Sequence, residues 1–206
     1  MVIDDNWRRH VVETAWAFAN VAWTPTEQNA YHGYDANGVL VNTPDAGYAS
    51  EKYANCGWWQ VGRENQGVPY NWGGFCTVEE FQKAIADGAY AGNVPDSRDH
   101  KRGRQCVGVD CSGLVSVCWG LGEKYGTGGL PSVASKLETT DDLLPGDVLL
   151  LPGSHVMIFV AFTDDTKAAV EVIDATKGTG KVSSRVLQMS ELLNKGYAGY
   201  YYEGNS

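Results

Sequence analysis

The sequence lacks any apolar run that approaches the roughly 18 residues needed to span a bilayer. Its first residues also lack the basic segment and apolar core of an export signal. We therefore expect no membrane span and no export signal within this chain. A chain trimmed of its leader would begin in the same way, so the compartment stays open between the cytoplasm and the cell envelope or exterior.

Positive charge is also scarce, with 16 Lys and Arg against 25 Asp and Glu and a formal net charge of −9 at pH 7. The mean field of such a protein repels nucleic acids, so we predict no nucleic-acid partner. A cationic cluster stands out in the polar stretch 95–104. A solvated loop is its ordinary interpretation, and capture of a substrate carboxylate is the alternative. Its members are Arg98, His100, Lys101, Arg102 and Arg104.

Closely spaced cysteine pairs are absent. The five cysteines are Cys56, Cys76, Cys106, Cys111 and Cys118, and no two have the Cys-x-x-Cys spacing of a zinc knuckle. Because their number is odd, at least one is unpaired within the chain. Cys76 and Cys106 bracket one segment and are candidates for a disulfide. Nothing establishes an oxidising compartment, so free thiols are the alternative.

The pattern of the chain changes halfway along. Residues 4–23 have the apolar period of a helix, and residues 77–88 begin with a capping box and end at a glycine. The second half contains short runs rich in β-branched and aromatic residues, separated by turn signals. Helices followed by an antiparallel meander predict an α+β fold. The expected strands are residues 147–151, 156–162, 169–173, 182–186 and 200–202.

Residues 24–67 are rich in glycine, asparagine, proline and aromatic residues, and they show no sustained period. Such a segment can wall a binding cleft, but it more often packs over the core as a long ordered loop. Its aromatic residues include Tyr31, Tyr34, Tyr48, Tyr53, Trp58 and Trp59.

Residues 110–113, Asp-Cys-Ser-Gly, are the most informative stretch. Apolar residues recur at helical spacing from Cys111 onward, so Cys111 should begin an amphipathic helix. The N–H groups and macrodipole of a helix N-terminus favour negative charge and so stabilise a thiolate. Cys111 is therefore the candidate nucleophile, whereas Cys118, two turns inside the apolar face, is expected to be an ordinary core thiol.

A cysteine nucleophile needs a base within hydrogen-bond reach and a third group that orients the base. His155 is the candidate base because it follows a turn and opens an apolar strand. Asp174 is the candidate orienting group, since two antiparallel strands joined through residues 164–165 would place it opposite His155. Glu171 is the alternative, but it is an odd number of residues away and should face the other side of the sheet. The remaining histidines, expected at the surface, are His10, His32 and His100.

Four segments in this order resemble the successive motifs of the NlpC cell-wall peptidase family, which comprises papain-like cysteine peptidases of bacteria. They are residues 69–74 (Pro-Tyr-Asn-Trp-Gly-Gly), 108–115 (Gly-Val-Asp-Cys-Ser-Gly-Leu-Val), 144–148 (Leu-Pro-Gly-Asp-Val) and 155–156 (His-Val). The resemblance spans residues 67 to 202. It implies a papain-like fold, with helices packed on a short-stranded antiparallel sheet, and it implies Cys111 as nucleophile and His155 as general base.

The resemblance also implies substrate-binding residues near the cysteine. Tyr70 resembles the family tyrosine that faces the nucleophile, and Trp72 belongs to the same motif. Asp110 and Ser112 resemble the residues that help to hold the free amine of the substrate. The resemblance thus places Tyr70, Trp72, Asp110 and Ser112 around the substrate.

Three features depart from the family pattern. Asp174 stands where the family commonly has histidine, asparagine or glutamine. Residues 77–104 form an insertion longer than expected, and residues 1–66 match no wall-binding module. The expected organisation is an aromatic-rich, helical and irregular N-terminal extension, residues 1–66, packed on a catalytic domain at residues 67–206.

The resemblance implies hydrolysis of an amide bond in peptidoglycan stem peptides, between D-γ-glutamate and a diamino acid, with no metal or organic cofactor. The expected partner is a peptidoglycan peptide or muropeptide. Short soluble muropeptides with a free amine are expected to be preferred, because the extension and the insertion should narrow the cleft. Two alternatives stay open: an amidase or acyl transferase acting on another isopeptide, and a non-catalytic muropeptide-binding module.

Overall fold

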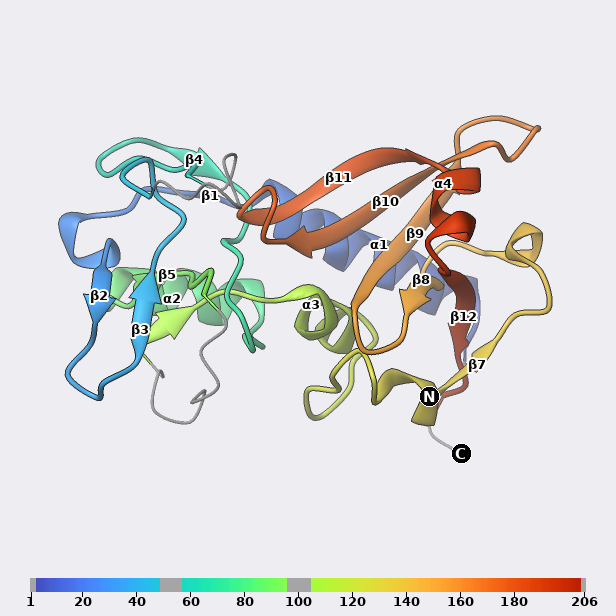
Figure 1. Ribbon diagram of the computed structural model, residues 1–206, viewed down its shortest axis with the longest axis horizontal. Coiled ribbons are helices and arrows are strands. Elements are labelled where there is room, and N and C mark those ends of the chain that lie inside the picture. Colours follow the sequence, from blue (N-terminus) through green and yellow to red (C-terminus); the bar gives the residue numbers. More distant parts are fainter. Residues whose placement is uncertain (1–2, 49–56, 96–104, 205–206) are drawn as a thin grey trace.

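The computed structural model describes residues 3–48, 57–95 and 105–204. Six strands form its main sheet: β7 (Ala134–Lys136), β8 (Val148–Leu151), β9 (His155–Phe162), β10 (Ala169–Thr176), β11 (Lys181–Gln188) and β12 (Ala198–Tyr202). All pairs are antiparallel, in the order β11-β10-β9-β8-β12-β7 (Figure 1). Strands β8 to β11 form the predicted meander, so the expected mixture of helices and an antiparallel sheet is confirmed. The sequence analysis missed β7.

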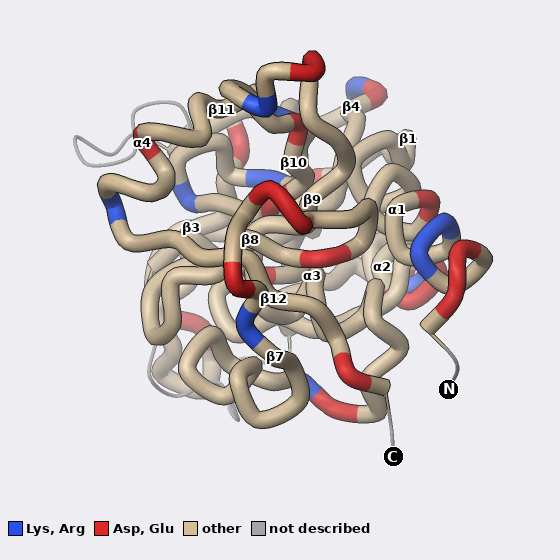
Figure 2. Tube along the Cα trace, turned by 90° about the vertical axis from the view of Figure 1, so that its right-hand side faces the viewer, with Lys and Arg blue, Asp and Glu red and all other residues tan. Residues whose placement is uncertain are grey.

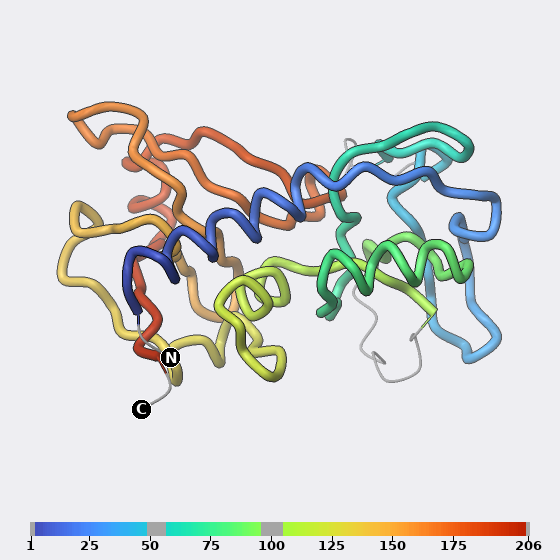
Figure 3. The backbone as a smooth tube through the Cα atoms, turned by 180° about the vertical axis from the view of Figure 1, so that it is seen from behind, coloured from blue at the N-terminus to red at the C-terminus, as the bar shows by residue number. Residues whose placement is uncertain are grey.

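Both faces of this sheet are buried, which explains why its central strands are nearly continuous apolar runs. Along β8, Val148 and Leu150 belong to one core cluster, and Leu149 between them belongs to the other. Helices α1 (Asp5–Asn20) and α3 (Cys111–Cys118) pack on the first face, and α4 (Met189–Asn194) packs on the second. Figure 3 shows α1 running along the back of the sheet toward the centre of the molecule.

Helix α1 belongs to the main core. Asp4 caps the helix, with Oδ1 accepting the Trp7 N–H at 2.8 Å. The helix ends at Asn20, short of the expected residue 23, because the chain turns there into a short strand that pairs Trp23 with Asn65. The buried residues of α1 belong to the same core cluster as α3 and the sheet, so one core includes residues from both sides of position 66. These α1 residues are Trp7, Val11, Ala15 and Phe18.

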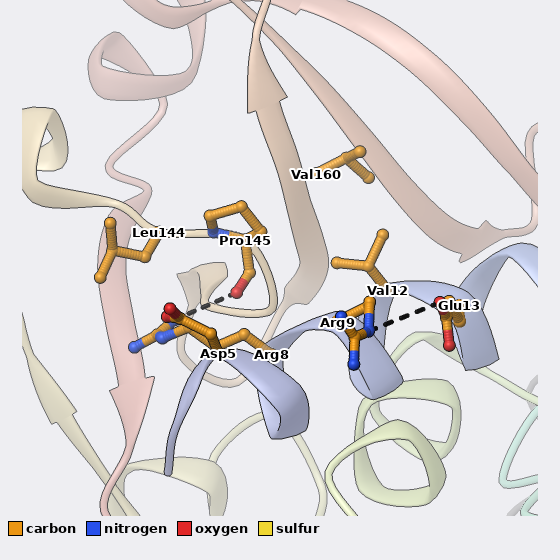
Figure 4. Close-up of a pocket in the computed structure, with 8 residues that line it drawn as sticks. All are labelled: Asp5, Arg8, Arg9, Val12, Glu13, Leu144, Pro145 and Val160. Atoms are coloured by element: carbon orange, nitrogen blue, oxygen red, sulfur yellow. Dashed lines mark hydrogen bonds and ion pairs between the residues drawn. The ribbon is translucent and has the colours of Figure 1, made fainter.

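An ion pair fastens α1 to the turn before β8. Arg8 Nη1 lies 2.7 Å from Asp147 Oδ1 and donates to the Pro145 carbonyl oxygen at 3.1 Å. Burial raises the pKa of the Asp147 carboxyl, while hydrogen bonds from Leu144 N–H and Arg8 oppose the rise. A groove of about 460 Å³ opens between α1 and this turn (Figure 4). The ion pair therefore fixes the first half of α1 along one side of the groove.

Residues between α1 and α3 build the opposite end of the molecule (Figure 1). Trp23 packs edge-on against Trp59 and Phe81, with ring centroids 5.5 Å and 5.3 Å away. Trp59 is fully buried, so packing over the core, the ordinary interpretation of the aromatic stretch, is confirmed there. The elements of this end are β1 (Ala22–Trp23), η1 (Glu27–Asn29), β2 (His32–Tyr34), β3 (Leu40–Asn42), β4 (Asn65–Gln66), α2 (Val78–Ala86), β5 (Tyr90–Ala91) and β6 (Cys106–Val107).

The capping box predicted from the sequence places the start of α2 correctly: Thr77 Oγ1 accepts the Glu80 N–H at 3.2 Å. The remaining elements are the short helices η2 (Leu130–Ser132) and η3 (Thr140–Asp142), which flank β7.

The first turn of α3 approaches residues 73–74 so closely that only glycine fits at position 113. A Cβ on Gly113 would lie 1.9 Å from the carbonyl oxygen of Gly74. Alanine ordinarily stabilises a helix by about 1 kcal/mol relative to glycine. We predict that Gly113→Ala nonetheless lowers the melting temperature by roughly 4 °C or more. Gly122→Ala is the matched control, because nothing lies within 4 Å of its added Cβ. Equal melting temperatures, measured by thermal unfolding, would contradict this prediction.

Candidate active site

Cys111 is the first residue of α3, as predicted. Asp110 caps the helix, with Oδ1 accepting the Gly113 N–H at 2.7 Å. Its Oδ2 accepts the N–H of Gly73 at 2.8 Å, which ties the helix to the segment that carries Tyr70. The thiol therefore lies where the helix N–H groups favour a thiolate, on a turn that Asp110 holds in place.

His155 opens β9, a strand that packs against α3. Its Nε2 lies 2.6 Å from Oδ2 of Asp174, and the Cys111 thiol lies close enough to the ring to raise its pKa. Because Nε2 faces Asp174, Nδ1 is the ring nitrogen left for the thiol. Burial lowers the pKa of His155, but the hydrogen bonds and charges of Asp174 and Cys111 outweigh it and raise the pKa to about 9. The imidazole is therefore protonated at neutral pH.

Asp174 is fully buried, and its predicted contact with His155 is confirmed. The carboxylate lies inside β10 rather than just beyond it, because the strand continues to Thr176. The alternative, Glu171, instead accepts a hydrogen bond from Ser184 Oγ at 2.8 Å. The structure thus brings together all three residues that the sequence assigned to the catalytic site.

Arg185 on β11 is a site residue that the sequence analysis missed. Its Nε donates to Oδ1 of Asp174 at 3.0 Å, and its Nη2 donates to Oδ2. This bidentate ion pair compensates the charge of the buried carboxylate. Asp174 pairs with Ser183 across the hairpin, so Arg185 lies diagonally across on the same face. The available sequence signal was Arg185 itself, a charged residue within the predicted strand 182–186.

Tyr197 is a second missed residue of the site. Its ring meets the His155 imidazole edge-on, with centroids 6.5 Å apart and an interplanar angle of 86°. Burial raises the pKa of the Tyr197 hydroxyl, the charges of Asp174 and Cys111 raise it further, and Arg185 opposes them. Tyr197 therefore packs beside the imidazole and near the charges of the site.

A cavity of about 210 Å³ lies beside Cys111. Neither residues 1–66 nor residues 77–104 contribute to its lining within the described part of the chain. The expected narrowing of the cleft by the extension and the insertion is therefore not seen at this pocket. The lining residues are Tyr70, Cys111, Ser154, His155, Ala175, Thr176 and Lys177.

The other predicted substrate-binding residues have partners within the protein. The buried Ser112 donates its hydroxyl to Oδ1 of Asp110 at 3.1 Å. Lys124 Nζ lies 3.1 Å from Oδ2 of Asp110 and 3.2 Å from the Ser112 hydroxyl. Trp72 packs against the main core cluster and is not among the residues that line the pocket. Binding of a substrate amine by Asp110 and Ser112 stays a prediction, and such an amine would have to compete with Lys124.

The other described cysteines differ from Cys111. Cys76, Cys106 and Cys118 are free thiols, so the disulfide considered for Cys76 and Cys106 is absent. Burial raises the pKa of Cys76 and of Cys106 to about 12, and it also raises the pKa of Cys118. Burial therefore disfavours a thiolate at these three positions. Cys56 and the cationic cluster of residues 98–104 lie outside the described residues.

Features of other functional classes were sought in the described part of the chain. Along the backbone, Lys and Arg positions alternate with Asp and Glu positions in the view of Figure 2. No helix among the described residues is long and apolar enough to cross a membrane. Within the same residues, no group of three or more His, Cys, Asp or Glu side chains is placed to hold a metal ion.

We predict that limiting iodoacetamide near neutral pH modifies Cys111 before Cys76, Cys106 or Cys118, because burial keeps the other thiols protonated. Peptide mass analysis identifies the modified residue. His155→Ala should slow alkylation of Cys111 by roughly tenfold or more. In the unmodified protein, the excess reactivity over a simple thiol should be present near neutral pH and fall as the pH passes about 9, where the imidazolium loses its proton. Preferential modification of Cys76 or Cys106 would contradict the assignment.

The rate of Cys111 alkylation also tests the residues that orient and charge-compensate His155. Asp174→Asn should slow this alkylation roughly ten- to a thousandfold, because asparagine accepts the ring N–H without stabilising the imidazolium. Arg185→Ala should lower both the rate and the melting temperature, since the buried carboxylate then keeps one partner. Arg185→Lys should have a smaller effect, and Arg9→Ala, on the exposed face of α1, is the control. Full reactivity in Asp174→Ala together with loss in Glu171→Ala would show that the orienting residue is misassigned.

Comparison of the chain with protein-family models, with curated proteins and with solved structures finds no match. Cys111, His155 and Asp174 are therefore the basis on which a function can be assigned.

Proposed function

We propose that the protein is a cysteine peptidase that hydrolyses amide bonds of peptidoglycan stem peptides. The observation that carries the proposal is the arrangement of Cys111, His155 and Asp174: the thiol and the imidazole line one pocket and interact, and the imidazole is hydrogen-bonded to the buried carboxylate. A papain-like fold is part of the proposal. It is supported by a helix with a cysteine at its first position, packed on an antiparallel sheet in which one strand begins with a histidine.

The proposed reaction uses these residues in two steps. The Cys111 thiolate attacks the amide carbonyl, and the Cys111 N–H at the start of α3, with Tyr70, helps to stabilise the oxyanion. The His155 imidazolium then protonates the leaving amine, which leaves an acyl-enzyme. In the second step His155 removes a proton from water, the hydroxide attacks the thioester, and the acid product leaves with Cys111 restored. Asp174 and Arg185 keep the imidazole oriented throughout.

The substrate class is supported by the four segments that resemble NlpC peptidases. The bond proposed to be cleaved joins D-γ-glutamate to a diamino acid. The expected preference for substrates with a free amine is less well supported, since Lys124 already forms an ion pair with Asp110. A substrate amine would replace one ammonium by another, so it would gain little net Coulomb energy.

Mass analysis of purified muropeptides incubated with the protein tests this proposal. Products should correspond to addition of water across the bond between D-γ-glutamate and the diamino acid. Cys111→Ala should reduce their formation about a thousandfold or more, whereas Cys106→Ala should leave it unchanged. Comparing a free tripeptide with intact sacculi decides whether a free amine is required.

Two results would replace the proposal with one of its alternatives. Transfer of the acyl group to an added amine in preference to water would make the protein an acyl transferase. Binding of muropeptides without any cleavage would make it a binding module. If muropeptides are neither cleaved nor bound, peptidoglycan peptides are not the ligand.

A further inference from the structure

One lysine side chain contacts both residues that flank the nucleophile. Lys124 Nζ lies 3.1 Å from Oδ2 of Asp110 and 3.2 Å from the hydroxyl oxygen of Ser112. These two residues directly precede and follow Cys111 in the chain. The Lys124 side chain is 24% exposed and the Asp110 side chain 11%, so water and salt screen this ion pair less than one on the surface. The ammonium is therefore held beside the turn that carries the thiol.

Asp110 has a partner for each of its acceptor positions. An ionised carboxylate accepts about four hydrogen bonds. The Gly113 N–H and the Ser112 hydroxyl donate to Oδ1 at 2.7 Å and 3.1 Å, and the Gly73 N–H donates to Oδ2 at 2.8 Å. Lys124 is the fourth donor, and among these four it is the one that carries a charge. It therefore compensates the negative charge that the cap brings to the start of α3.

Hydrogen bonds to α3 fix the loop that carries Lys124. The Leu121 N–H donates to the carbonyl oxygen of Ser116 at 2.9 Å. The Tyr125 N–H donates to the Ser116 hydroxyl oxygen at 3.1 Å, and this hydroxyl donates to the carbonyl oxygen of Ser112 at 2.8 Å. Ser116 itself is fully buried. The place of Lys124 is thus set by contacts on both sides of it in the chain, and not by the ion pair alone.

The other ionisable groups around Cys111 come from other elements. The imidazolium of His155 on β9 favours the thiolate, whereas Asp174 on β10 opposes it but is paired with Arg185 on β11. The remaining ionisable groups that line the pocket or interact with the thiol are Tyr70, Lys177 and Tyr197. Asp174 and Asp110 thus each have a cation beside them, the first from the sheet and the second from the loop after α3.

We propose that Lys124 is a positioning residue that acts through Asp110: it compensates this carboxylate and so favours the thiolate form of Cys111. A carboxylate beside a thiol disfavours the thiolate, because like charges repel. Asp110 also caps α3 and ties it to the segment that carries Tyr70, so this carboxylate belongs to the scaffold of the site. Lys124 lets the same residue hold the nucleophile in place without suppressing its ionisation. The inference rests on the proposed function only for the role of the thiolate as the attacking group.

The pH dependence of Cys111 alkylation by iodoacetamide tests the proposal without any peptide substrate. The rate rises with pH as the thiolate forms, and the midpoint of this rise is the quantity measured. Lys124→Met should move the midpoint up by about one pH unit, the effect of one partly screened charge at short range. Lys124→Arg, which keeps the charge, should move it less. Lys83→Met is the matched control, because it removes the exposed ion pair of Lys83 with Asp87 and should leave the midpoint unchanged.

Removal of the carboxylate provides an arm of opposite sign. Asp110→Asn should move the midpoint down, because Lys124 then lacks its counter-charge, and asparagine is also a favoured N-cap. The variant that carries both Asp110→Asn and Lys124→Met should return toward the unmodified midpoint. A purely structural role for Lys124 predicts lower melting temperatures but no such opposite shifts.

An unchanged midpoint in Lys124→Met, with an unchanged melting temperature, overturns the proposal. If Lys124→Met does not fold, Lys124→Gln, which keeps a hydrogen-bond donor without the charge, decides by the same criterion. Failure of the unmodified protein to cleave muropeptides would overturn the proposed function instead, and the midpoints would still decide the role of Lys124.

Discussion

The structure depends most on one buried charge. Asp174 is completely excluded from solvent, and an isolated carboxylate in that environment would cost several kcal/mol. Arg185 and His155 compensate it from the two neighbouring strands, β11 and β9. The three strands must therefore keep their register for the charge to stay paired, because a slip of one residue would turn a partner to the other face. The same ion pairs that stabilise the sheet also orient the imidazole toward Cys111.

A second constraint brings the nucleophile to that imidazole. Asp110 uses one carboxylate oxygen to cap α3 and the other to accept the N–H of Gly73, so it ties the Cys111 turn to the segment that carries Tyr70. The close approach of Gly113 to Gly74 makes this junction intolerant of even one added carbon atom. Helix α3 packs on the sheet face opposite α4, through a core that also includes α1. One core cluster thus joins α1, α3 and the sheet, and the reactive groups lie where α3 meets the sheet.

The charge of the site follows from the same pairings. Asp174 and Asp110 flank the reactive residues, but each has a cation at hydrogen-bond distance, so neither presents a free negative charge to a ligand. Arg185 and His155 share the charge of Asp174, which helps to keep the imidazole protonated.

The sequence by itself determined the elements whose signals are local. The helical stripe that begins at Cys111 and the capping box of α2 predicted two helices, and the apolar runs predicted the main strands. The link from His155 to Asp174 was also within reach, because a hairpin brings the start of one strand near the end of the next, although the register puts Asp174 diagonally across from His155 rather than opposite it. Only the tertiary structure decided which side chains meet the site, namely Arg185, Lys124 and Tyr197. It also decided that α1 belongs to the core and that Cys76 and Cys106 are free thiols. Each of these depends on the register or packing of segments distant in sequence, and local periodicity carries no information about which distant side chain will meet a buried charge.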